Sequence, residues 1–136
     1  KLRRKIMKIT LIRNFFTAVL MGLFAQVSLA QEENAMGALK EVADIVASIN
    51  HFPSDADKVA LASIAGNDNL PQGVRNMATT VTNIAHGAND QGKNAMATIQ
   101  AMDRTPNNAK VLAGMIANFN HMLSAEQKST LAKLFP

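Results

Sequence analysis

Apolar residues recur at fixed distances from a series of evenly spaced basic residues. The basic residues lie 17 or 18 positions apart and are Lys40, Lys58, Arg75, Lys93, Lys110 and Lys128. Three positions after them stand Ala43, Leu61, Ala78, Met96, Ala113 and Leu131. Six positions after them stand Val46, Ile64, Val81, Ile99, Ile116 and Leu134. This spacing places both apolar sets on one helix face and predicts an amphipathic helix at each basic residue.

Two consecutive intervals make a repeat of 35 residues, which other residue types also follow. The residues that recur with this period are His51, His86 and His121, Pro71 and Pro106, and Ser54, Asn89 and Ser124. A fixed period of this length is typical of arrays of helical hairpins. The unit length is similar to that of tetratricopeptide or HEAT-like arrays, but the Trp and Tyr signatures of the first are absent.

Capping residues predict where the helices begin. Ser54 and Ser124 are suited to N-caps, each with an acceptor three residues later, and Asn89 is a weaker copy. Pro71 and Pro106 suit the first helical position, where the missing N–H loses no helical bond. The predicted helices are residues 36–49, 55–66, 71–86, 90–102, 106–121 and 125–135.

Connections of about three to five residues make consecutive helices antiparallel, so each 35-residue unit is predicted to be a helical hairpin. One hairpin cannot bury its apolar face alone, whereas three stacked hairpins share a core. The predicted fold is therefore all-α, with about six short antiparallel helices forming three stacked hairpins. An α-solenoid-like array and a compact bundle both fit this pattern.

The first 30 residues have the pattern of a secretory signal peptide. Six basic and no acidic residues precede an apolar run from Phe15 to Ala25, and Ser28 and Ala30 supply small residues before a cut after Ala30. The apolar run is shorter than the roughly 20 residues of a membrane anchor, so cleavage is expected. Met7 is a possible true start. We expect an exported protein, periplasmic or secreted, with one helical-repeat domain over residues 31–136 and no stable membrane insertion.

Removal of the leader changes the charge. The formal net charge of the whole chain is +4, but the portion after residue 30 keeps eight basic and ten acidic residues, a charge of −2. Such a domain offers neither a basic stripe nor a stacking surface for bases, which argues against nucleic-acid binding. The chain has no cysteine, so disulfides, thiolate metal sites and thiol nucleophiles are excluded.

The repeated histidines His51, His86 and His121 are the candidate metal ligands, and copper or zinc is the metal they suggest. A structural interpretation competes, because imidazole at a helix C-terminus also binds the last free carbonyls. In a linear stack with axes 8 to 10 Å apart, adjacent histidines share a metal at most in pairs. The first and third are then about twice as far apart, so a site of all three is not expected. Six methionines follow the leader, and Met77, Met96 and Met102 are predicted to pack in the core.

Nothing in the sequence indicates catalysis. No Ser-His-Asp arrangement, paired carboxylates or glycine-rich phosphate loop has supporting spacing, and the acidic residues fall mainly on early helical turns. We therefore expect a protein that is not an enzyme and needs no cofactor.

The five residues from Leu123 to Gln127, Leu-Ser-Ala-Glu-Gln, resemble the Leu-Thr-x-x-Gln signature of small periplasmic helical chaperones of the Spy and CpxP kind. That resemblance implies a stress-related holdase, as a minor alternative. The repeat itself favours a protein or peptide interaction module, because stacked helical surfaces usually serve this purpose. Exported metal handling through the three histidines is the other alternative.

Overall fold

The computed structural model describes residues 29–136 of the chain. By internal contacts the chain divides into Lys1–Glu33 and Asn34–Pro136, and the second unit holds the repeats. The predicted leader, residues 1–30 with Met7 as its alternative start, lies outside the described residues except for its last two positions.

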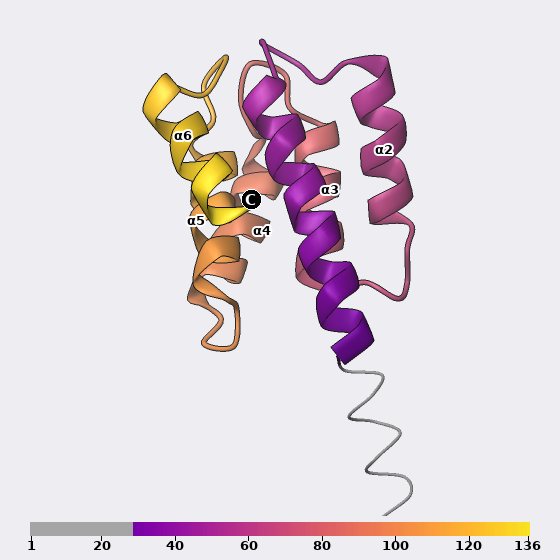
Figure 1. Ribbon diagram of the computed structural model, residues 1–136. Coiled ribbons are helices and arrows are strands. Elements are labelled where there is room, and N and C mark those ends of the chain that lie inside the picture. Colours follow the sequence, from indigo (N-terminus) through magenta and orange to yellow (C-terminus); the bar gives the residue numbers. More distant parts are fainter. Residues whose placement is uncertain (1–28) are drawn as a thin grey trace, which may run out of the picture. The chain divides into compact units, whose positions relative to one another are not determined.

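The described residues form six helices and no strand, which confirms the all-α prediction. The first helix is described from residue 29 to 48. It is followed by α2 (Asp55–Ala65), α3 (Gln72–Thr82), α4 (Asp90–Ala101), α5 (Asn107–Ala117) and α6 (Ala125–Leu134), five of them labelled in Figure 1. Within residues 29–136 no helix combines the length and the apolar character needed to span a membrane.

The even-numbered helices agree with the prediction to within one residue, but α3 and α5 end about four residues early. Asn83 and Asn118 end these two helices, and each side-chain amide donates to a carbonyl of the last turn, at 2.8 and 2.9 Å. Carbonyls of the last turn have few helical partners at a C-terminus, and the Gly114 carbonyl also accepts from the backbone N–H of Asn118. Ile84 and Phe119 beyond the ends are still buried. The apolar spacing therefore continues beyond the last helical residue. For this reason the predicted C-terminal ends of α3 and α5 were wrong.

Side-chain caps fix the starts of α2, α4 and α6. Ser54 accepts from the backbone N–H of Asp57, and Ser124 from that of Gln127, and both form complete capping boxes. Asn89 accepts from the N–H of Gly92. The helices α3 and α5 follow a proline that makes no side-chain cap bond. Pro71 and Pro106 are the N-cap residues of these helices, one position before the predicted first helical position.

Ser54→Ala and Ser124→Ala are each expected to lower the free energy of unfolding by about 0.5 to 2 kcal/mol. The substitution leaves a backbone N–H in the first turn of the helix without its acceptor. The helical content measured by circular dichroism should stay the same. Ser129→Ala, at an exposed position inside α6, is the control and should not lower stability. Chemical denaturation of the three variants tests this, and equal stability of all three would contradict the cap assignment.

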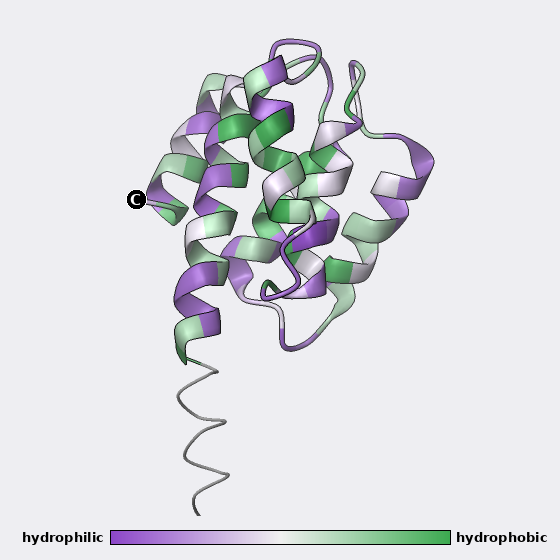
Figure 2. Cartoon of the chain, turned by 90° about the vertical axis from the view of Figure 1, so that its right-hand side faces the viewer, coloured by the Kyte–Doolittle hydropathy of each residue, from purple (hydrophilic) through white to green (hydrophobic). Residues whose placement is uncertain are grey.

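The core repeats with the same period as the sequence. Each of the first helix, α3 and α5, taken with the loop that follows it, contributes four residues that are at most 4% exposed: Val42, Ala43, Val46 and Ile49; Met77, Ala78, Val81 and Ile84; Leu112, Ala113, Ile116 and Phe119. In Figure 2 the green, apolar segments gather where these helices face one another. The second residue of each set is a small alanine, which permits close helix approach: Ala43, Ala78 and Ala113. Met77 and Met96 are buried as predicted, but Met102 is 51% exposed, because α4 ends at Ala101 and Met102 is extended.

The C-terminal end of the last helix contacts the first helix. Consecutive helices pack on one another, as the hairpin prediction requires. The most extensive packing, of α2 with α3 and of α4 with α5, lies between successive 35-residue units and not within one unit. The Lys40 ammonium in the first helix donates to the carbonyl of Phe135 at 3.0 Å, across 95 residues of sequence. Figure 1 shows the C-terminus beside the first helix. One repeat later, Arg75 pairs with Asp68 in the linker before its own helix. Lys40 and Arg75 are corresponding residues of the repeat, and the Lys40 contact joins the end of the last unit to the first.

Candidate metal centre

The three histidines lie in the loops that follow the first helix, α3 and α5. Each loop runs from the end of one helix to the N-cap of the next, at Ser54, Asn89 and Ser124. The prediction that His51, His86 and His121 sit on the last helical turn is wrong, because the helices end at residues 48, 82 and 117. Their imidazoles are therefore free of the helix-end role that the structural interpretation gave them.

All three histidines adopt the left-handed backbone conformation. Their φ angles are 73°, 67° and 63° for His51, His86 and His121, and they are the non-glycine residues with positive φ in the described chain. This conformation costs an L-residue about 1 to 2 kcal/mol, and it persists when the surroundings impose it. Strain of this kind, repeated three times at one residue type, indicates that the three loops hold the histidines in a common arrangement.

A closed ring of backbone hydrogen bonds provides that constraint. The N–H of His86 donates to the carbonyl of His51 at 2.7 Å, the N–H of His121 to that of His86 at 2.6 Å, and the N–H of His51 to that of His121 at 2.6 Å. Each histidine thus donates once and accepts once, and the ring links all three repeats. The arrangement has an approximate threefold axis.

The imidazoles gather around this axis. The ring centroids are 5.2 Å apart for His51 and His86, and 5.0 Å apart for each of the other two pairs. One nitrogen from each ring lies within 4.8 Å of the others. The expectation that the first and third histidines lie far apart is therefore wrong. It assumed a linear stack, whereas the hairpins close into a ring and bring the first repeat against the third.

Two of the three imidazoles are fixed by a neighbouring amide. The Nδ1 of His51 lies 2.6 Å from Oδ1 of Asn50, and the Nδ1 of His121 lies 2.5 Å from Oδ1 of Asn120. The corresponding residue in the middle repeat is Ala85. Sequence reasoning missed both asparagines, although an Asn directly before the repeated His in two of three units was a signal that could have found them.

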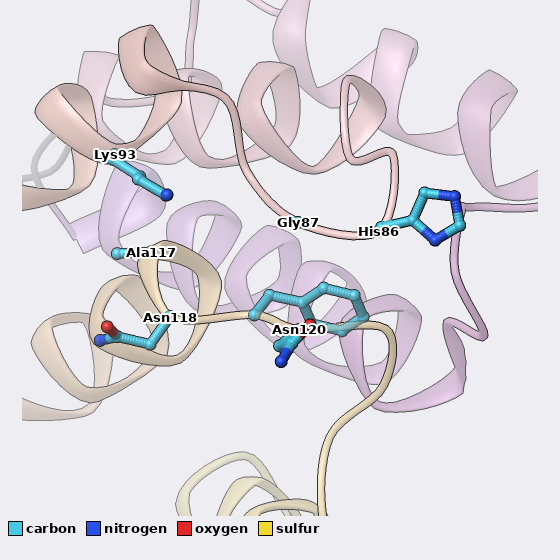
Figure 3. A pocket seen from close by; sticks show the side chains of 7 residues that line it. His86, Gly87, Lys93, Ala117, Asn118 and Asn120 are labelled. Carbon is cyan, nitrogen blue, oxygen red and sulfur yellow. The ribbon is translucent and has the colours of Figure 1, made fainter.

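The histidines face solvent at the edge of a surface depression. His51 is half-buried and the other two are exposed. The depression, about 560 Å³ in volume, lies beside His86 and is lined by Gly87, Lys93, Ala117, Asn118, Phe119 and Asn120. In Figure 3 the His86 ring extends away from the other labelled side chains. The imidazole cluster is therefore open to an ion arriving from solution.

Three neutral imidazoles are a ligand set for borderline divalent metals. Zn(II), Cu(II) and Ni(II) all bind imidazole nitrogen well. Three histidines with a fourth position left to water or another ligand are a known arrangement for zinc. Nitrogens at Zn–N distances of 2.0 to 2.1 Å lie about 3.4 Å apart in a tetrahedral site. The three nitrogens, which lie within 4.8 Å of one another, need only small shifts to reach that separation.

Comparison with known proteins adds no family to this description: no family model, no curated protein and no solved structure matches the chain. The site therefore has to be interpreted from its own geometry.

Proposed function

We propose that the protein binds one divalent transition-metal ion, zinc or copper, between the imidazoles of His51, His86 and His121. The observation that carries the proposal is the gathering of three nitrogens within 4.8 Å of one another. We propose that the protein does so outside the cytoplasm, because residues 1–30 have the pattern of a secretory signal peptide. We assign it no catalytic reaction.

The architecture supports a binding role over an accidental cluster. The histidines are the residues on which all three repeats converge, and their strained backbones are linked by the hydrogen-bonded ring. A site that draws one ligand from each repeat forms only when the fold is closed. Metal binding would then stabilise the folded protein, because the unfolded chain cannot assemble the three ligands.

The test is a thermal melt with a chelator, with Zn(II) and with Cu(II), on the wild type and on a triple His→Asn variant. Asparagine tolerates the left-handed conformation, so the variant removes the imidazoles with little change of backbone strain. At a free metal concentration 100 times Kd, the wild type should gain about 2.7 kcal/mol and the variant nothing. Equal metal response of the two proteins, or none in the wild type, would overturn the proposal.

A second proposal is that the face around the histidines binds a protein partner. Phe52 and Met122, which directly follow two of the histidines, are 61% and 49% exposed. Exposed aromatic and methionine side chains are common in partner-binding surfaces. If this holds, Phe52→Ser should abolish a stoichiometric crosslinked product in the exported fraction. Val59→Ser, at a 73% exposed position on α2, should leave that product unchanged, and loss in both variants would contradict the assignment.

A further inference from the structure

We propose that the metal site has two ligands fixed in advance and one that exchanges. Asn50 and Asn120 orient His51 and His121 so that their Nε2 atoms bind the metal, whereas His86 is the ligand that attaches and detaches. This inference rests on the proposed metal binding and specifies how the site takes up and releases its ion.

The hydrogen bonds to the asparagines determine which ring nitrogen can bind. An amide Oδ1 only accepts hydrogen bonds, so at 2.6 and 2.5 Å the Nδ1 of His51 and of His121 carries the proton and donates. Nε2 of each neutral ring then keeps its free lone pair and is the remaining metal ligand. Partners of this kind usually hold the second nitrogen of metal-binding histidines, fixing both tautomer and ring orientation.

The middle repeat lacks this device. Ala85 stands where the other repeats have asparagine, and no hydrogen bond to the His86 ring occurs among the described residues. The ring is exposed and extends outward from its loop. An imidazole that no hydrogen bond orients loses more conformational entropy on binding than one that a hydrogen bond already orients. His86 should therefore contribute least to affinity and leave the metal first.

The asymmetry gives the site a route for metal transfer. An ion held by His51 and His121 stays bound while His86 detaches, and the position it leaves is open to a ligand from solution. Full threefold symmetry would instead hold the ion with three oriented rings and slow its release. The substitution Ala85→Asn creates that symmetric site within the existing loop.

Zinc titration calorimetry with competing chelators tests the roles of the amides. Asn50→Ala and Asn120→Ala should each weaken zinc binding by about 10- to 100-fold, the usual effect of removing such a partner. Ala85→Asn should tighten binding and slow zinc dissociation in stopped-flow exchange. Asn83→Ala, which removes an amide that bonds a carbonyl of the last turn of α3, is the matched control and should bind zinc as the wild type does. Unchanged affinity in both Asn→Ala variants, or in Ala85→Asn, would overturn the proposal.

A second measurement separates ring orientation from fold stability. In ¹⁵N NMR spectra of the metal-free protein, His51 and His121 should be protonated at Nδ1, and His86 should show both tautomers. Asn50→Asp, which still accepts from Nδ1, should restore the tautomer and zinc affinity that Asn50→Ala loses. Failure of the wild type to bind zinc would remove the proposed function, whereas zinc binding with mixed tautomers at all three rings would remove only this inference.

Discussion

Leu112→Ala is expected to lower the free energy of unfolding by about 2 to 5 kcal/mol. Leu112 is completely buried in α5, and the corresponding positions of the other repeats hold Val42 and Met77, which are also buried. Removal of its side chain leaves a cavity that tightly packed neighbours fill only in part. Denaturation by urea, followed by circular dichroism, measures the loss.

Val59→Ala is the control for this prediction. Val59 is 73% exposed on α2, so its truncation should change stability by about 0.5 kcal/mol or less. A loss for Leu112→Ala no greater than that of the control would show that position 112 is not at the core of the folded protein.

The helices could be predicted because their signals are local. Ser54 and Ser124 act within three residues of themselves, and both are the N-caps that the sequence predicted. The apolar stripe likewise depends on spacing within one helix. The ends of α3 and α5 were predicted less well, since Ile84 and Phe119 continue the apolar period after the backbone has left the helix. Buried residues therefore keep the apolar spacing even in the loop that follows the helix.

The meeting of the histidines could not be predicted, because the sequence period sets the content of each repeat and not the rotation between repeats. Identical hairpins can stack in a line or close into a ring. The contacts that distinguish these arrangements join distant residues: His51 with His121, 70 positions apart in sequence, and Lys40 with Phe135, 95 positions apart. No local pattern encodes either contact. The same repetition brings one histidine of each unit into the cluster.

A triple His→Gly variant is expected to be more stable than a triple His→Ala variant by about 3 kcal/mol, measured with a chelator present. Both variants lose the same imidazole contacts, so the comparison isolates the backbone. A left-handed residue with a Cβ costs about 1 to 2 kcal/mol, and part of the advantage of glycine is offset by its greater freedom in the unfolded chain. About 1 kcal/mol remains at each of the three positions, whose φ angles are 63° to 73°.

A comparison of alanine with glycine inside an ordinary helix provides the control, because there the alanine form should be the more stable one. Ala56 lies exposed in the first turn of α2, where Ala56→Gly should cost up to about 1 kcal/mol because glycine loses more conformational freedom on folding. If His→Ala proves as stable as His→Gly at all three loops, the histidine backbones are not held in the left-handed conformation. The ring of backbone hydrogen bonds that holds the three histidines together would then not form in solution. The stability difference therefore tests the backbone arrangement of the proposed metal site without any metal.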